Sequence, residues 1–361
     1  MGVAASIDRF QRRFPPLGFP LAVIYKFFDD QGNQLAAVVT YYAFVAIFPL
    51  MLLGSSILGF VLEDRPHLQE ALLDTALSQF PIIGDELGRP DGLRGSTSGV
   101  VIGSLVATYG AMGLGLAIQN VVNAAWSVPR NSRPNPIMLR LRSLLLLLTA
   151  GLALLAVSLV SALFTNTELL GGLADWWPLS LPTWLVPVLS ALVVGGMLTL
   201  LLRVAAARDH PLLGAAPGGF AIAAMWQAVQ WLGAQFVTGV INRTEGMNQT
   251  FALVLGLVGF LYVVAVVGVL GIEINVVLVR RLWPRALLTP FTDRVDLTDA
   301  DRRAYASYAL MQRHKGFETV AVSFEGRDGD THEIVMDPSW ARKGHASAGM
   351  DPRGEVTERV D

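Results

Sequence analysis

The sequence predicts an all-α, polytopic membrane protein with six transmembrane helices. The 361 residues are 53% hydrophobic and only 16% charged, with a mean hydropathy of +0.49. Soluble domains carry about 25% charged residues, and about 20 apolar residues suffice to cross the hydrocarbon layer. Six apolar segments of at least that length lie at about 34–62, 98–126, 141–164, 183–207, 212–241 and 250–282.

The distribution of Lys and Arg near the span ends predicts the orientation, because cytoplasmic loops carry the excess of these residues. One side has Arg9, Arg12, Arg13, Lys26, Arg130, Arg133, Arg140, Arg142, Arg203, Arg208, Arg280, Arg281 and Arg285. The other side has Arg65, Arg89, Arg94 and Arg243, among many acidic residues. We therefore expect both termini in the cytoplasm.

Composition divides the chain into an N-terminal arm (1–30), a six-helix membrane domain (31–285) and a cytoplasmic tail (286–361). Within the arm, 17–28 suits a helix lying in the membrane interface, with an ordinary loop helix packed on the bundle as the alternative. Residues 66–80 suit either a second interfacial helix or an ordinary loop helix packed on the bundle. In the tail, 319–337 alternates as a β-hairpin does, and the last twenty residues predict disorder.

A carboxylate, Glu273, lies inside the apolar run "VVGVLGIEINVVLVRR", with Asn275 beside it. An ionised carboxylate in a membrane costs several kcal/mol unless it is paired or hydrated. Arg280 shares its helix face but lies two turns away, too far for a direct salt bridge. Glu273 therefore needs a partner on another helix, a water-filled vestibule, or a proton, and Arg140 and Arg142 are the candidate partners. The residue either locks two helices together, forms a substrate or proton site, or extends to the interface.

The second span has small residues at steps of four, which let another helix approach closely. The series runs Gly99, Gly103, Ala107, Ala111 and Gly115, and Gln119 and Asn123 continue it. Tight packing is the favoured interpretation of the small residues, with Gly103 and Gly115 as its contact points and Gly271 as another in the last span.

The fifth span contains Gln227 and Gln230, one turn apart. These amides either form hydrogen bonds between helices or line a cavity. In the first span Pro49 removes a backbone donor, which predicts a kink.

Catalysis and cofactor binding have little support. The five His residues are scattered, there is no Cys, and no metal-ligand spacing, P-loop or GxSxG motif occurs. The net charge of −2 gives no sign of a nucleic-acid partner. We expect no enzyme activity, no cofactor and no metal.

Three stretches, "LAAVVTYYAFVAIFPLML", "LGLAIQNVVNAAWSVPR" and "VLGIEINVVLVRR", resemble the YihY/BrkB family of bacterial inner-membrane proteins over roughly 20–285. The family's recurrent positions fall on Tyr41, Pro49, Asn123, Trp126, Gly271, Glu273 and Asn275. Members often have Ser before "FP" and "GAELN" where this chain has Ala46–Ile47 and "GIEIN". The resemblance implies a multi-pass protein of the bacterial inner membrane and links it with envelope lipid handling. The family was once labelled ribonuclease BN, which this sequence does not favour.

The sequence is compatible with two functions. In the first, the protein transports or flips a lipid or amphipathic envelope solute through a polar vestibule of Glu273, Asn275, Asn123 and Gln119, continued inward by Gln227 and Gln230. In the second, it is a non-transporting scaffold for envelope assembly, and the same residues clamp helices. A membrane hydrolase or nuclease is disfavoured. The lipid bilayer is the expected partner, and the sequence is compatible with a homo-oligomer.

Overall fold

The computed structural model describes residues 8, 10–61, 97–165, 185–205, 212–239, 247–289, 292, 295–325, 331–337 and 358–359. Its contacts divide the chain into two compact units. Unit 1 comprises Met1–Gln31, Val122–Asn135 and Glu273–Asp361, and unit 2 comprises Gly32–Val121 and Pro136–Ile272.

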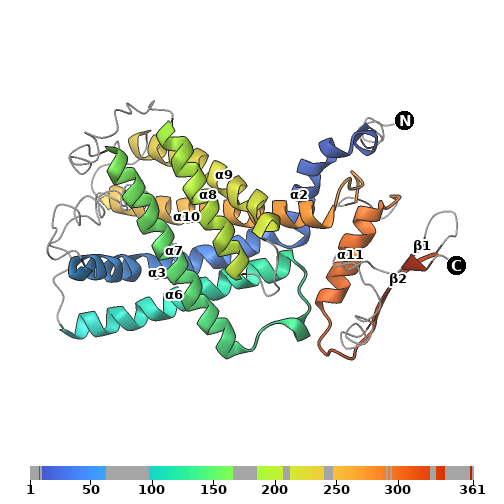
Figure 1. The fold of residues 1–361 in the computed structure, drawn as a ribbon, viewed down its shortest axis with the longest axis horizontal. Helices are drawn as coiled ribbons and strands as arrows, with labels where there is room; N and C mark the ends of the chain where they lie inside the picture. Colours follow the sequence, from blue (N-terminus) through green and yellow to red (C-terminus); the bar gives the residue numbers. More distant parts are fainter. Residues whose placement is uncertain are drawn as a thin grey trace, which may run out of the picture. The chain divides into compact units, whose positions relative to one another are not determined.

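A helix occurs at each of the six predicted spans (Figure 1). They are α3 (Gly32–Val61), α6 (Thr97–Ala125), α7 (Pro136–Thr165), α8 (Leu185–Ala205), α9 (Leu212–Gly239) and α10 (Met247–Arg280). Among the described residues, one helical segment, Val254–Arg280, is long and apolar enough to cross a membrane, with a mean hydropathy of 2.6. Gly32–Ile47 and Ala191–Arg203 are shorter apolar segments. Six crossings and the orientation of the termini therefore stay predictions.

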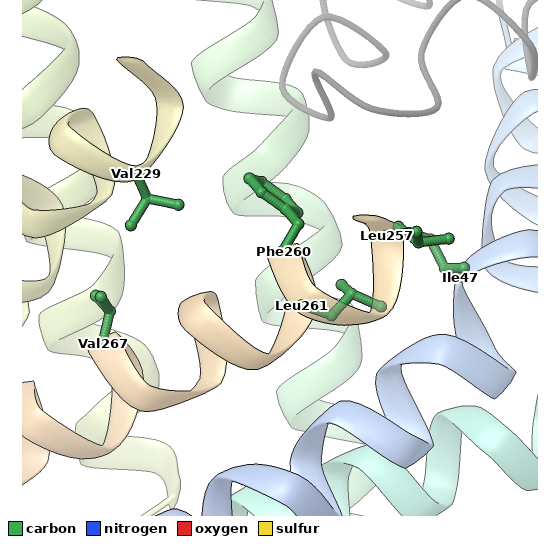
Figure 2. Close-up of a cluster of buried hydrophobic side chains, with 6 residues drawn as sticks. All are labelled: Ile47, Val229, Leu257, Phe260, Leu261 and Val267. Atoms are coloured by element: carbon green, nitrogen blue, oxygen red, sulfur yellow. The ribbon is translucent and has the colours of Figure 1, made fainter. Parts of the chain in front are cut away.

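The apolar core of unit 2 lies where α3, α9 and α10 meet. It contains Ile47 from α3, Val229 from α9, and Leu257, Phe260, Leu261 and Val267 from α10 (Figure 2). Trp226 of α9 packs edge-on against Phe260, with ring centroids 6.2 Å apart. Aromatic and branched side chains at helical spacing on α10 thus place one face of this helix against its neighbours.

Helices α8 and α9 lie side by side in unit 2 and approach closely through small residues (Figure 1). A Cβ atom on Gly219 would lie 2.7 Å from the backbone nitrogen of Thr199 and 2.9 Å from the carbonyl oxygen of Gly195. The Thr199 hydroxyl donates to the same carbonyl at 2.7 Å. Only a glycine lets the backbones come this near, as is usual where membrane helices associate by packing.

In unit 1 the predicted helix over 17–28 is present as α2 (Gly18–Asp29), after the short 3-10 turn η1 (Pro15–Leu17). One face of α2 is buried, while Leu17, Ile24 and Phe28 are exposed. The amphipathic pattern is confirmed as a helix, and its place in the membrane interface stays a prediction. The predicted helix over 66–80 lies outside the described residues.

The C-terminal part of unit 1 contains α11 (Asp299–Met311) and a three-stranded sheet. The hairpin predicted over 319–337 is present as β1 (Val320–Glu325) and β2 (Thr331–Met336), paired antiparallel with Val320 opposite Met336. Ala306 of α11 packs with Ile334 and Met336 in a small core. The short strand β3 (Glu358–Arg359) pairs with β2. At these two residues the edge of β2 offers backbone partners, and the predicted disorder of the last twenty residues stays a prediction.

Helices α6 and α10 end in the same way, with a residue in the left-handed region just past the last turn. Ser127 has a φ of 45° and Arg281 a φ of 51°. The nitrogen of Val128 donates to the carbonyl of Asn123 at 2.8 Å, and that of Leu282 to Val277 at 3.1 Å. These bonds across five residues complete Schellman-type ends. At these two ends, both in unit 1, the chain changes direction as it leaves each helix.

Candidate functional site

Glu273 lies near the C-terminal end of α10 and is fully buried, with 0% of its surface exposed. Its carboxylate oxygen Oε2 is 3.5 Å from the ammonium nitrogen of Lys26, which is also 0% exposed. Neither carboxylate oxygen has a hydrogen-bond partner among the described residues. Of the three alternatives predicted for Glu273, a partner on another helix is present, but this partner is Lys26 of α2. The candidates named from sequence, Arg140 and Arg142, are on α7, and Arg140 is exposed.

Lys26 is shared between two carboxylates. Its ammonium group forms an ion pair with Asp30, four residues along the chain, whose side chain is only 2% exposed. The ammonium also lies 5.2 Å from the centroid of the Tyr308 ring, where a cation is attracted to the aromatic face. The Tyr308 hydroxyl is buried without a hydrogen-bond partner among the described residues. The surroundings of Glu273 are therefore polar, close-packed and incompletely bonded.

Arg285 forms a second buried ion group just beyond α10. Its guanidinium pairs with Asp301 of α11 and, at 3.0 Å, with Asp29 of α2. It also lies 5.4 Å from the centroid of the Tyr305 ring. The second oxygen of Asp301 accepts the backbone N–H of Ala286 at 3.0 Å. This carboxylate thus joins α11 to the chain leaving α10.

Asp301 also begins α11. It accepts the backbone N–H of Thr298 at 3.0 Å, and the Thr298 hydroxyl accepts the N–H of Asp301 at 3.1 Å. This reciprocal capping box satisfies two N–H groups at the helix start. The same side chain therefore caps a helix and neutralises a buried cation.

We call the six charged residues around these two groups the ion cluster. They are Lys26, Asp29, Asp30, Glu273, Arg285 and Asp301.

Burial and charge act on the titrating groups of the cluster that lie outside the apolar span. Burial raises the pKa of Asp29, and the Arg285 guanidinium opposes that effect. Burial by itself would lower the pKa of Arg285, but Asp301 and Asp29 raise it above its ordinary value. Burial also raises the pKa of Tyr305 and of Tyr308. At neutral pH the guanidinium is therefore charged and both phenols are neutral.

The N-terminal residues hold the segment after α10 in place. The Gln11 amide donates to the carbonyl of Arg285 at 2.7 Å, and the N–H of Leu287 donates to Asp8 at 2.9 Å. The Tyr25 hydroxyl donates to the carbonyl of Leu287. Unit 1 thus combines residues from both ends of the chain around the ion cluster.

Two further residues of the predicted vestibule lie in unit 1. Asn275 is 3% exposed and Asn123 is 2% exposed, and the side-chain oxygen of Asn123 has no hydrogen-bond partner among the described residues. Nearby, the Arg280 guanidinium lies 5.7 Å from the centroid of the Trp126 ring and donates to the Trp126 carbonyl. The Arg280 guanidinium therefore both stacks on the Trp126 ring and donates to its backbone.

Gln119 belongs to unit 2 and joins α6 to α7. Its amide nitrogen donates to the Ser143 hydroxyl at 2.9 Å and to the carbonyl of Leu139 at 2.9 Å. One turn earlier, a Cβ on Gly115 would lie 2.6 Å from the Ser143 Cβ and 2.8 Å from its Cα. The structure thus supports the packing interpretation for Gly115 and adds a polar clamp at Gln119.

The remaining predicted residues are also in unit 2. On α9, Gln227 is exposed and Gln230 is half-buried. A Cβ on Gly271 would lie 2.1 Å from Cγ1 of Ile222, so α10 packs tightly on α9 there. Gly103 and Pro49 lie within α6 and α3, and the kink at Pro49 stays a prediction. A vestibule shared by all six polar residues is likewise a prediction.

Comparison with known proteins identifies the family. The family model described as virulence factor BrkB matches residues 23–291. The chain belongs to this family.

Two curated relatives of this BrkB family member are named membrane proteins. One is a UPF0761 membrane protein of Halorhodospira halophila, 28% identical over 270 residues, which cover 74% of this chain and 58% of that protein. The other is the inner membrane protein YhjD of Escherichia coli, 26% identical over 124 residues, which are 34% of each chain. The match thus spans little more than half the length of the first relative. No solved structure matches the chain. These findings make it a membrane protein and support the bacterial inner membrane as its location.

Several residues of the BrkB protein's ion cluster were missed by sequence reasoning. The sequence patterns single out neither Asp29, Asp30 and Asp301 of the cluster nor Tyr308 beside it. They assign Lys26 only to the interface and to the topology count, and Arg285 only to the topology count. The signals present were the spacing of Lys26 and Asp30, four apart on a predicted helix, and the pattern Thr298-x-x-Asp301. Within the described residues, no group of three or more His, Cys, Asp or Glu could hold a metal ion.

Proposed function

We propose that this BrkB family protein moves or handles a lipid or another amphipathic solute of the cell envelope. The observation that carries the proposal is Glu273, a fully buried carboxylate with no hydrogen bond to either oxygen, 3.5 Å from the buried ammonium of Lys26. Ionisable groups at the end of an apolar span are costly and are found mainly where ions, protons or substrates are bound.

The bonding pattern favours a working site over a structural clamp. A buried ion pair is stabilising only when additional hydrogen bonds satisfy its remaining atoms, and apolar residues of similar volume often stabilise as well or better. In the pair of Arg285 and Asp301 the carboxylate has such additional bonds, because Asp301 also accepts N–H groups of Ala286 and Thr298, while Nη1 of Arg285 has no hydrogen-bond partner among the described residues. Glu273 has none among the described residues. A group left in this state is suited to exchange partners.

The class of solute is inferred from the sequence of α10, which has a long apolar part followed by a short polar part. The helix is apolar over Val254–Arg280 apart from its last turns, where Glu273 and Asn275 lie. An amphipathic molecule needs a polar site for its head group and an apolar surface for its tail. Lys26 would attract an anionic head group, and Glu273 would compete with it for the ammonium.

The scaffold function has its own supporting observation in unit 2. There Gln119 bonds both Ser143 and Leu139, and Gly115 brings α6 against α7. These polar groups are satisfied by one another, as a permanent helix clamp requires. If the ion cluster behaved in the same way, the protein would hold helices together and transport nothing.

The test is lipid retention and lipid movement by the purified full-length chain. Wild type, Glu273→Gln and the control Thr40→Val are compared in nanodiscs by mass spectrometry of co-purified lipid. They are also compared in proteoliposomes by translocation of a fluorescent phospholipid. Thr40 is a buried polar residue of unit 2 whose hydroxyl donates to the carbonyl of Ala36 at 2.8 Å, and it is not a member of the ion cluster.

The proposal expects an enriched lipid and measurable translocation in wild type and in Thr40→Val, with both lost in folded Glu273→Gln. Bulk lipid composition and no translocation in all three proteins would overturn it and favour the scaffold.

A further inference from the structure

The ion cluster carries more negative than positive charge. Lys26 and Arg285 supply two cations, whereas Asp29, Asp30, Glu273 and Asp301 supply four carboxylates. Asp29 is a quarter exposed and water can solvate it. Arg285 and Asp301 neutralise each other in a bonded pair. The excess negative charge therefore lies in the triad of Lys26, Asp30 and Glu273, which has one ammonium and two carboxylates.

In this triad one ammonium faces two carboxylates. The exposed fractions of the three side chains are 0% for Lys26, 2% for Asp30 and 0% for Glu273. Asp30 forms the closer ion pair with Lys26 and also interacts electrostatically with Glu273. Two carboxylates that share a buried site cannot both stay ionised at low cost, because each disfavours the charge of the other.

No second cation neutralises the triad in the part of the chain that the structure describes. Arg285 pairs with Asp301 and Asp29, and Arg280 lies against Trp126. The remaining group that faces the triad is Tyr308 of α11, which is neutral. An unpaired charge buried in protein costs several kcal/mol, so the group takes up a proton instead.

We propose that Lys26, Asp30 and Glu273 together form a proton-binding site that holds one exchangeable proton, shared between the two carboxylates. Binding forms one O–H bond on a carboxylate oxygen, and release returns the proton to water with no other bond changed. The oxygens of Glu273, which have no hydrogen-bond partner among the described residues, provide the acceptor. The hydroxyl of Tyr308 on α11 also has no hydrogen-bond partner in that part of the chain. The site stands independently of transport. Its use to couple solute movement to a proton rests on the proposed function.

Infrared spectroscopy tests the site without any transport assay, because the C=O stretch of a protonated carboxyl group is distinct from that of a carboxylate. The full-length chain in nanodiscs is measured at neutral pH in H2O and D2O. The variants are Glu273→Gln, Asp30→Asn, Lys26→Met and the control Glu318→Gln. Glu318 is a partly exposed carboxylate outside the ion cluster, whose pKa is lowered by backbone N–H groups of His314 and Lys315.

The proposal expects a protonated-carboxyl band in wild type that shifts in D2O. The band should vanish in Glu273→Gln and in Asp30→Asn, since each leaves one carboxylate for one ammonium. It should stay unchanged in Glu318→Gln and become stronger in Lys26→Met, where no cation remains. If Lys26→Met does not fold, the two amide variants still decide the matter.

A wild-type protein without the band, or a band of equal strength in Glu273→Gln and Asp30→Asn, would overturn the proposal. A band that behaves as expected in a protein that moves no lipid would keep the proton site and remove the transport function. The two proposals therefore fail separately.

Discussion

Substitution of Gly115 by Ala should destabilise the contact between α6 and α7. The new Cβ would lie 2.6 Å from the Ser143 Cβ and 2.8 Å from the Ser143 Cα. Carbon atoms pack best at about 3.5–4.0 Å, so α7 must move away by about 1 Å. Because the close atoms belong to the backbone and first side-chain carbon of Ser143, no rotamer change relieves the clash.

The magnitude follows from three contributions. Overpacking costs about 1–3 kcal/mol. The shift also stretches the two 2.9 Å hydrogen bonds from Gln119 to Ser143 and Leu139. Each such bond is worth about 0.6 kcal/mol between membrane helices. The helix propensity of Ala is about 1 kcal/mol more favourable than that of Gly. This gain offsets the free energy lost when both hydrogen bonds are stretched. The net destabilisation is therefore about 1–3 kcal/mol.

The assay is thermal unfolding of the protein in nanodiscs, followed by tryptophan fluorescence. The matched control is Gly151→Ala on α7, where an added Cβ meets no atom within 4 Å. We expect a lower Tm for Gly115→Ala and an unchanged or higher Tm for Gly151→Ala. Equal Tm values for the two variants would refute the close approach of α6 and α7 at Gly115.

Three further predictions concern unit 1. Arg285→Met removes the cation from the buried Asp301, so unfolding should become about 3–5 kcal/mol easier by the same assay; an unchanged Tm would contradict the buried pair. Thr298→Ala deletes the capping hydroxyl of α11 and should cost about 1 kcal/mol, visible as faster hydrogen exchange confined to α11 and absent elsewhere. Burial raises the pKa of Tyr308 above its ordinary value, so its contribution to stability is present below about pH 10 and is lost as the pH rises further. Tyr308→Phe should therefore lose less Tm than wild type in alkaline buffer, and parallel pH profiles would contradict a buried phenol.

The positions of the six long helices were predictable because hydropathy is a local property of the chain. Each predicted span overlaps one of α3, α6, α7, α8, α9 and α10. Helix α11 was missed because its surface-type composition shows no apolar run. Its start is marked only by the capping pattern at Thr298 and Asp301, which a short polar segment can carry by chance.

The ion cluster could be predicted only in outline. The sequence shows that Glu273 requires a partner, since a lone buried carboxylate is too costly. It does not show which cation is near, because Lys26 and Glu273 are far apart along the chain and many Arg residues lie on the same predicted side. Arg140 and Arg142 were reasonable candidates by depth, yet the structure pairs Glu273 with a lysine of the arm. The close contact at Gly115, by contrast, followed from regular spacing within one helix.

The segment that resembles the BrkB family ends at residue 291, but the folding boundary of unit 1 lies further along the chain. Asp301 is ten residues beyond the end of that match, and it neutralises Arg285, which lies inside it. A protein shortened to residues 1–291 would keep the guanidinium and lose the carboxylate, the capping box and the Tyr308 ring over Lys26. We therefore expect a stable form of the membrane protein to include α11, even though the part that identifies its family does not.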